Sequence, residues 1–263
     1  MNPLSAIILG IVQGLTEFLP ISSSGHLVLA QNLLGHKEPA LLFDVAVHLG
    51  TLVAVVVFYR NDLLRLFKSL PSLKKPDFKN NTDHNLLAAL FVITLITGVV
   101  GLTGKDFFES LFASVSFVCS MLIVTGVVLL LTRAVPGSDT KKTVSLPKAL
   151  VIGVAQSLAI LPGISRSGST IAAALFLKTG REEAARLSFL AMIPAALGAA
   201  ILTAKDVAST ESATLVASAI GIVVSAVVGY FALVILIRFV QSGKLYLFGP
   251  YCIGVGILGL LLL

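Results

Sequence analysis

Long apolar blocks separated by short polar segments dominate this chain. Six of these blocks cover residues 42–59, 86–104, 111–133, 186–203, 213–237 and 247–263. Each is close to the about 20 residues that a helix needs to cross the hydrocarbon core of a membrane. The pattern therefore predicts an all-α integral membrane protein in which six helices span the membrane and residues 1–263 form a single membrane domain.

Two further apolar segments are interrupted by proline and serine, which predicts broken helices. Pieces 5–19 and 25–34 flank the first break, and pieces 148–161 and 168–177 flank the second. The second piece of each pair has about ten residues and covers roughly 15 Å, half of the hydrocarbon core. Since that piece cannot span alone, each pair is either one interrupted span or a re-entrant hairpin.

The two interrupted segments resemble one another, which indicates an internal duplication. Six residues of the first recur 143 positions later in the second: Gly10, Gln13, Ile21, Ser22, Ser24 and Gly25 recur as Gly153, Gln156, Ile164, Ser165, Ser167 and Gly168. We place repeat 1 at residues 1–140 and repeat 2 at residues 141–263. Each repeat then contains one broken pair and three spanning helices.

The distribution of Lys and Arg favours re-entrant hairpins over interrupted spans. Re-entrant hairpins place 15 of these residues on one side of the membrane and three on the other, whereas spanning pairs divide them 11 to 7. Positive residues concentrate in cytoplasmic loops, so the stronger asymmetry is preferred. The basic side receives loops 60–84, 133–148, 178–186 and 238–244, and the other side receives Lys37, Lys105 and Lys205.

This arrangement predicts an inverted repeat, because each half crosses the membrane an odd number of times. Both termini are then expected outside the cytoplasm. The first hairpin enters from outside and the second from the cytoplasm, so their tips can meet within the membrane. Irregular backbone at that depth must be buried in protein or line a cavity.

Composition supports the membrane prediction and argues against other classes. Hydrophobic residues make up 56% of the chain and charged residues 12%, against about 45–50% and 25% in soluble domains. The net charge of +6 arises between the apolar blocks, without basic runs interleaved with aromatic residues, so no nucleic-acid partner is expected. Cys119 and Cys252 lie in apolar segments, which predicts buried thiols rather than a disulfide framework.

Ionisable residues within the apolar segments mark candidate sites. Glu17 is the least expected of them, because a charge inside a membrane helix costs about 3 kcal/mol or more unless it is paired or hydrated. Gln13 lies one turn earlier on the same helical face, so the pair predicts a cation site, with a structural partnership as the alternative. We attribute Asp44 and His48 to helix-dipole matching and interhelical hydrogen bonding rather than to a polar cavity.

The serine clusters at the two breaks suit an anionic ligand. Ser22, Ser23 and Ser24 precede a helix that could use them for capping or could bind phosphate at its free N–H groups, with His26 one turn inside the helix start. The second break repeats the arrangement with Arg166 in place of Ser23, and this guanidinium needs Glu17 or a substrate phosphate as partner. Together the tips predict phosphoryl transfer. Residues expected to bind the substrate are Ser22, Ser24, Gly163, Ser165, Ser167, Gly168 and Thr170.

At these residues the sequence resembles the undecaprenyl-diphosphate phosphatase family, also known as BacA-type bacitracin resistance proteins. The first family signature, Glu or Gln followed four residues later by Glu, is present at 13–17, and Ser-Ser-x-Gly-His follows at 22–26. The second signature, Pro-Gly-x-Ser-Arg-Ser-x-x-Thr, is present in full at 162–170. The resemblance covers essentially the whole chain.

The resemblance implies a hydrolase of the bacterial plasma membrane that recycles the lipid carrier of peptidoglycan synthesis. Such an enzyme removes the terminal phosphate of C55 isoprenyl diphosphate at the outer face, assisted by Mg²⁺ or Ca²⁺. By motif position, Glu17, Ser23, His26 and Arg166 would be catalytic. Gln13 and Glu17 would bind the metal, although the amide adds no charge, so a weaker site or an ion carried by the diphosphate is expected.

Several alternatives stay open at the level of sequence. The nucleophile is Ser23, which we favour, or His26, or water. A transporter or flippase of a polyprenyl phosphate lipid also fits, because inverted repeats with broken helices serve alternating access. An intramembrane protease using Ser23 and His26 fits less well, since the two lie three residues apart on one helix start and Arg166 has no role in it. Small residues in the C-terminal spans would permit a homodimer.

Overall fold

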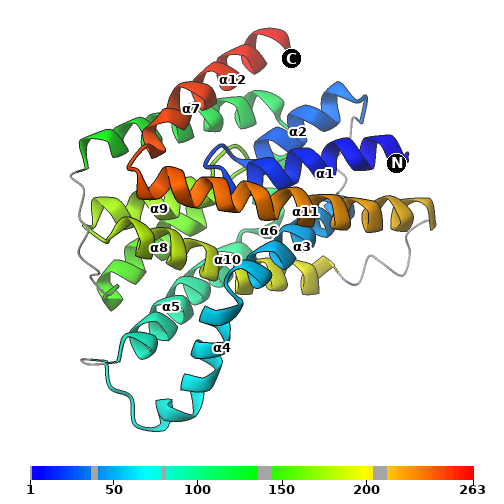
Figure 1. Ribbon diagram of the computed structural model, residues 1–263. Coiled ribbons are helices and arrows are strands. Elements are labelled where there is room, and N and C mark those ends of the chain that lie inside the picture. Colours follow the sequence, from blue (N-terminus) through cyan, green and yellow to red (C-terminus); the bar gives the residue numbers. More distant parts are fainter. Residues whose placement is uncertain (1, 37–40, 79–80, 136–143, 204–211) are drawn as a thin grey trace.

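The computed structural model describes residues 2–36, 41–78, 81–135, 144–203 and 212–263, and within these ranges the chain is helical and contains no strand (Figure 1). The predicted all-α fold is confirmed. The α-helices are α1 (Pro3–Phe18), α2 (Ser23–Leu33), α3 (Leu41–Phe58), α4 (Arg60–Ser69), α5 (Thr82–Thr103), α6 (Lys105–Leu111), α7 (Val115–Leu131), α8 (Leu146–Leu158), α9 (Arg166–Phe176), α10 (Arg181–Thr203), α11 (Ser212–Gln241) and α12 (Phe248–Leu262).

The predicted spanning segments are confirmed as helices. Within the described chain, five helical segments are long and apolar enough to cross a membrane, namely those at α5, α7, α10, α11 and α12. A sixth candidate is α3 taken together with the segment up to Lys74, which is bent by 76° at the junction. Among the residues that entered the loop-charge argument, five lie outside the described residues: Lys37, Lys79, Lys141, Lys142 and Lys205.

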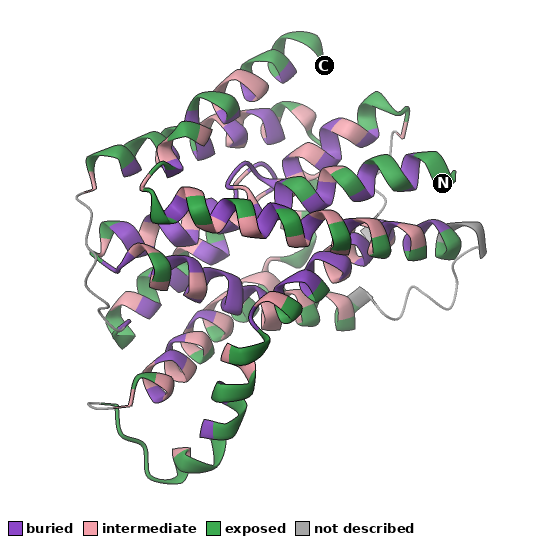
Figure 2. Cartoon of the chain, in the orientation of Figure 1, coloured by how far each residue is buried: buried purple, intermediate pink, exposed green. Residues whose placement is uncertain are grey.

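The outward faces of the long helices carry large apolar side chains. Phe91 on α5 is 67% exposed, and Phe231 on α11 is 63% exposed. Figure 2 shows exposed residues along the outer sides of the bundle, with the buried residues turned inward. Because such a surface in water would be highly unfavourable, it indicates a lipid environment around the bundle.

The segment that we treated as the connecting loop 60–84 is largely helical, which the loop assignment missed. Leu66 of α4 is buried, so the helix has a packed side as well as a solvated one. Asp62 on α4 pairs with Arg186 on α10 at 2.9 Å, and Arg65 pairs with Asp83 on α5 at 3.0 Å. These tertiary contacts stabilise a short helix, whereas its basic composition alone predicts a loop. A second short helix, α6, occupies the connection between α5 and α7.

Both predicted helix breaks are present, and their local geometry is the same. α1 ends at Phe18 before α2, and α8 ends at Leu158 before α9. In the first break the Ser22 hydroxyl accepts from the Gly25 N–H at 3.2 Å, and in the second Ser165 accepts from Gly168 at 3.0 Å. The matching residues of the duplicated sequence therefore perform the same N-capping function.

Each broken helix packs on a long helix of the other half of the chain. α1 contacts α11, and α8 contacts α5; α3 likewise contacts α11, and α10 contacts α5. Small residues permit the close approach: a Cβ on Gly14 would lie 2.8 Å from Val228 Cβ, and one on Gly10 would lie 3.1 Å from Val224 Cβ. The two halves thus interleave rather than standing side by side.

Two glycines of the last helix pack within the chain, whereas, among the described residues, nothing lies within 4 Å of a Cβ added at Gly254. A Cβ on Gly249 would lie 2.8 Å from the Gly126 carbonyl oxygen, and one on Gly256 would lie 2.6 Å from the Cys119 carbonyl oxygen, both on α7. These glycines allow α12 to pack closely on α7 of the same chain. They are therefore not free to form a dimer interface, and the homodimer stays a prediction without support from this feature.

Replacing Gly50 with alanine should loosen the contact between α3 and α11. A Cβ there would lie 2.3 Å from the Ile222 carbonyl oxygen, which is backbone and cannot turn aside. We expect a loss of about 1–3 kcal/mol of stability, measured as a lower Tm in detergent. Gly98→Ala on α5 is the matched control, because nothing lies within 4 Å of its added Cβ. Equal Tm values for the two variants would contradict the close packing.

Candidate functional site

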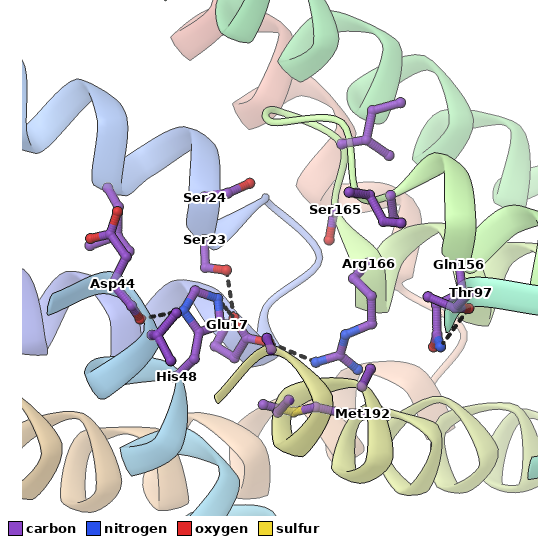
Figure 3. Close-up of a pocket in the computed structure, with 18 of the residues that line it drawn as sticks. Glu17, Ser23, Ser24, Asp44, His48, Thr97, Gln156, Ser165, Arg166 and Met192 are labelled. Atoms are coloured by element: carbon purple, nitrogen blue, oxygen red, sulfur yellow. Dashed lines mark hydrogen bonds and ion pairs between the residues drawn. The ribbon is translucent and has the colours of Figure 1, made fainter. Parts of the chain in front are cut away.

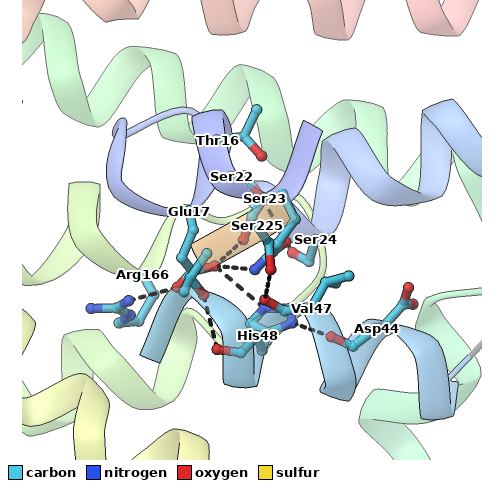
Figure 4. A network of polar contacts seen from close by, with 12 residues as sticks. Thr16, Glu17, Ser22, Ser23, Ser24, Asp44, Val47, His48, Arg166 and Ser225 are labelled. Carbon is cyan, nitrogen blue, oxygen red and sulfur yellow. Dashed lines mark hydrogen bonds and ion pairs between the residues drawn. The ribbon is translucent and has the colours of Figure 1, made fainter. Parts of the chain in front are cut away.

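Glu17 is the centre of a polar cluster formed where the two helix breaks meet. Its carboxylate is buried in the last turn of α1. Arg166 Nη2 donates to Oε1 at 2.7 Å, and Ser23 Oγ donates to Oε2 at 2.5 Å. Gln13 Nε2 also donates to Oε2 at 3.0 Å, and His48 Nε2 lies 3.3 Å from the same oxygen (Figure 4). A buried charge is thus compensated from three other helices and from its own helix.

The first break presents Ser23 to Glu17. α1 stops before Pro20, and Ser22 adopts a φ of 69°, which is rare for a residue with a side chain. This turn reverses the chain so that Ser23, the first residue of α2, faces back toward the end of α1. The strained Ser22 backbone therefore brings a hydroxyl and a carboxylate six residues apart into direct contact.

The second break is held in place by α7. Gly163 has a φ of 95°, and a Cβ there would lie 2.3 Å from the Val118 carbonyl oxygen, so only glycine fits. Thr125 Oγ1 donates to the Gly163 carbonyl at 2.9 Å and accepts from the Ser165 N–H at 3.0 Å. One buried hydroxyl thereby satisfies two backbone groups of the turn and positions Arg166, the next residue.

Arg166 lies between α1 and α10. In addition to Glu17, its Nη1 donates to the Ser188 carbonyl at 3.1 Å. Thr170 braces this arrangement, since its hydroxyl donates to the Arg166 carbonyl at 2.8 Å and lies 2.6 Å from Ser188 Oγ. A guanidinium has five N–H groups, and the hydrogen bonds among the described residues use two of them. The remaining N–H groups can bind an anion.

A cavity of about 330 Å³ opens beside the cluster (Figure 3). The polar end of its lining includes Glu17, Ser23 and Arg166, whereas most of the remaining surface is apolar. This combination suits a ligand with an anionic head and an apolar chain. The lining residues are Glu17, Ser23, Ser24, Leu27, Asp44, Val45, His48, Thr97, Phe112, Gln156, Ala159, Ile160, Ile164, Ser165, Arg166, Met192, Ala195, Ala196 and Ala199.

The structure divides the residues predicted to bind substrate into two groups. Ser24 and Ser165 line the cavity. The other five lie outside the described cavity lining: the Ser22 hydroxyl caps α2, and the Ser167 hydroxyl lies 3.3 Å from Ser165 Oγ. These five residues, whose geometry indicates turning, capping and bracing, are Ser22, Gly163, Ser167, Gly168 and Thr170.

His26, predicted as catalytic, is not brought to Glu17. Its Nδ1 lies 2.8 Å from the Ser22 carbonyl oxygen, which holds the imidazole against the start of its own helix. Its Nε2 lies 2.9 Å from the Tyr251 hydroxyl on α12, and the two rings stack with their centroids 5.6 Å apart. The position of His26 along α2 turns its side chain away from Ser23. The expectation that His26 lies beside Glu17 is therefore corrected, and its catalytic role stays a prediction.

His48 and Asp44 belong to the cavity, which the sequence interpretation missed. Both line it, and His48 contacts Glu17 directly. The interhelical hydrogen bond expected for Asp44 is present, since Gln31 Nε2 on α2 donates to Asp44 Oδ1 at 2.6 Å. Two ionisable residues one turn apart in an apolar span were the available signal, because such residues usually mark functional sites in membranes.

The geometry does not fit a metal ion held by Gln13 and Glu17. Gln13 is fully buried and, among the described residues, is not part of the cavity lining; its Oε1 has no hydrogen-bond partner there. The described chain also contains no cluster of three or more His, Cys, Asp or Glu arranged to hold a metal. Mg²⁺ and Ca²⁺ take about six or more oxygen ligands. An ion in this cavity would therefore depend on ligands from phosphate and water.

Comparisons with known proteins cover the part of the chain that contains this site. The family model described as "Bacitracin resistance protein BacA" matches residues 6–258. The chain belongs to the BacA family. Relatives of this BacA-family chain are named "Undecaprenyl-diphosphatase": that of Desulforapulum autotrophicum is 46% identical over 99% of the chain and 98% of the relative. Those of Desulfosudis oleivorans (46%, 97% of both) and Methanosphaera stadtmanae (41%, 100% and 98%) are similar.

Thr125→Val should disturb the second turn and, through it, Arg166. The substitution removes one hydroxyl and leaves two buried backbone groups, on Gly163 and Ser165, without a partner. We expect a loss of about 1–3 kcal/mol, measured as a lower Tm, together with lower activity. Thr103→Val serves as control, because its exposed hydroxyl bonds only within α5. A variant at 125 as stable and active as the control would contradict the bracing role.

Lipid-free protein should bind Mg²⁺ and Ca²⁺ weakly. Titration calorimetry in detergent is expected to show no saturable binding until a polyprenyl methylenediphosphonate, a non-hydrolysable diphosphate, is added. Gln13→Glu should not tighten this binding, because residue 13 is fully buried and is not part of the described cavity lining. Micromolar binding by the lipid-free wild type would show instead that the protein holds its own metal.

Proposed function

We propose that this BacA-family chain hydrolyses undecaprenyl diphosphate to undecaprenyl phosphate and inorganic phosphate. The observation that carries the proposal is the buried carboxylate of Glu17, which contacts both the Ser23 hydroxyl and the Arg166 guanidinium at one end of an apolar cavity. A nucleophile, a base and a phosphate-binding cation are thereby placed together. The names of the relatives support the same reaction and give no support to a flippase.

In the proposed first step, Ser23 attacks the terminal phosphorus. Its hydroxyl already donates to Glu17 Oε2 at 2.5 Å, so the carboxylate is placed to take the proton as the new O–P bond forms. The bond from that phosphorus to the bridging oxygen breaks, and its electron pair leaves with undecaprenyl phosphate. The N–H groups of Arg166 not used by Glu17 and Ser188 stabilise the phosphoryl oxygens.

In the proposed second step, water releases the phosphate from Ser23. Water attacks the phosphorus as the bond to Ser23 Oγ breaks. The protonated Glu17 returns its proton to Ser23 Oγ, and the carboxylate that this restores takes the proton lost by the water. α2 begins at Ser23 and α9 begins at Arg166, so both helix N-termini lie at residues of the cluster, where their positive dipole ends would stabilise negative charge. The net products are undecaprenyl phosphate and inorganic phosphate, and Ser23 is restored.

The expected divalent cation belongs to the substrate in this proposal. Since the protein presents one carboxylate of the predicted metal pair to the cavity, Mg²⁺ or Ca²⁺ would enter with the diphosphate and lower its negative charge. The steps above depend on the residues of the chain alone. The geometry also disfavours the protease alternative, because Ser23 bonds Glu17 while His26 bonds Tyr251.

We further infer that α1–α2 and α8–α9 are re-entrant hairpins of two inverted repeats, at 1–140 and 141–263. With 16 and 13 residues, α1 and α8 are about 24 and 20 Å long, short of the about 30 Å hydrocarbon core. The exchanged packing of α1 on α11 and of α8 on α5 supports an approximate two-fold relation between the halves. With the loop charges, this relation favours termini outside the cytoplasm and a site facing the outside of the plasma membrane.

Phosphate release from polyprenyl diphosphate by the purified protein tests the function. We expect Ser23→Ala and Glu17→Gln to lower kcat by about 10²–10⁴-fold, since they remove the nucleophile and the base. Arg166→Lys keeps a charge but cannot bind carboxylate and phosphate together, so a loss of about 10²-fold is expected. Ser120→Ala on α7, whose hydroxyl bonds Ser116 of its own helix, should retain activity.

Two outcomes would contradict the proposal. If the wild type releases no phosphate from any polyprenyl diphosphate, with or without Mg²⁺ or Ca²⁺, the chain is not this phosphatase. If Ser23→Ala retains wild-type kcat, the enzyme uses another nucleophile. His26→Phe, which preserves the stack on Tyr251, should lower activity less than Ser23→Ala does. An equal loss of activity would show that His26 takes part in the reaction.

A further inference from the structure

His48 contacts the proposed base from a third element, α3. Its Nε2 lies 3.3 Å from Glu17 Oε2, the same oxygen that accepts from Ser23. Its Nδ1 lies 2.7 Å from the carbonyl oxygen of Asp44, one turn earlier on its own helix. The side chain is 33% exposed and lines the cavity, so it connects the buried carboxylate with the space that the substrate would occupy (Figures 3 and 4).

Both ring nitrogens of His48 face oxygen acceptors. A backbone carbonyl can only accept a hydrogen bond, and so can an ionised carboxylate, whereas a neutral imidazole has one N–H group to donate. A neutral ring can therefore donate to only one of these two oxygens, and both contacts become hydrogen bonds only when one more proton lies on the ring or on Glu17. The pair is therefore built to hold the proton that the proposed reaction generates.

We infer that His48 is a positioning residue that acts through Glu17 by sharing the proton taken from Ser23. This inference rests on the proposed phosphatase function. As Ser23 Oγ bonds to phosphorus, its proton passes to the Glu17 carboxylate, and the hydrogen bond to His48 Nε2 stabilises the protonated pair. Ser23 recovers that proton when its bond to phosphorus breaks, and the proton from the attacking water leaves through the pair to the cavity.

The surroundings of His48 are consistent with this assignment. The charged or titratable groups that face it are Glu17 on α1, Asp44 on its own helix α3, and Arg166 on α9, which pairs with the other oxygen of Glu17. Arg166 and His48 thus hold the carboxylate from opposite oxygens. His26 has the same anchoring of Nδ1 on a carbonyl four residues earlier, but its Nε2 contacts Tyr251 instead of a carboxylate.

The close packing of α3 fixes the distance between His48 and Glu17. Ser225 Oγ on α11 donates to the Val47 carbonyl at 2.9 Å, beside His48. Thr51 Oγ1 donates to the His48 carbonyl at 2.9 Å. The backbone around His48 is thereby held by hydrogen bonds of two hydroxyls, so the side chain begins from a fixed position.

Two substitutions of His48 test the inference, because one keeps a hydrogen-bond donor toward Glu17 without the ability to take a proton, and the other removes both. His48→Gln retains an amide donor toward Glu17 but cannot take a proton, and His48→Ala leaves space open to the cavity. We expect both to lower kcat by about tenfold or more with KM within about threefold. The pH dependence of kcat in both variants should differ from that of the wild type. Added imidazole should restore part of the kcat of His48→Ala.

His36→Gln is the matched control, because His36 follows the end of α2 and, among the described residues, is not part of the cavity lining. It should keep wild-type kcat and pH dependence. A wild-type kcat and pH profile in folded His48→Gln, verified by Tm, would overturn the inference. So would a loss of kcat with an unchanged pH profile and no response of His48→Ala to imidazole, which would indicate packing alone. An inactive wild type would contradict the proposed phosphatase instead.

Discussion

The ion pair between Glu17 and Arg166 is the interaction on which the site depends. It joins residues 149 positions apart, one at the end of α1 and the other at the start of α9. Neither charge is stable alone at membrane depth, and removing one partner of a buried pair costs about 3–5 kcal/mol. The two helix breaks must therefore meet, and the long helices pack so that they can.

That meeting depends on the close approach of helices at small residues and on two unusual turns. Gly14 and Gly50 bring α1 and α3 against α11, and Gly163 lets the second turn pass beside α7. The backbone strain at Ser22 lies directly beside Ser23, whose hydroxyl contacts Glu17. Strain of this kind persists where surrounding packing enforces it, and it is often found at functional sites.

The two breaks have similar sequences and the same capping geometry but different chemistry. Ser22 and Ser165 cap their helices in the same way, whereas the next position is Ser23 in one copy and Arg166 in the other. One copy then supplies a hydroxyl beside a carboxylate, and the other supplies a fixed cation. His48 on α3 also contacts Glu17, so the cluster includes a residue from outside both breaks.

The sequence by itself determined the membrane class, the long helices, the two breaks and the meeting of Glu17, Ser23 and Arg166. These features follow from local properties: apolar length, proline and serine at helix ends, and charges that require partners in a membrane. The helix α4 was missed because Leu66 and Asp62 gain their stabilisation from distant segments. Only the tertiary structure decided which histidine reaches the carboxylate. His26 is near Ser23 in sequence, yet the rotation of α2 turns it to Tyr251, while the packing of α3 brings His48 to Glu17.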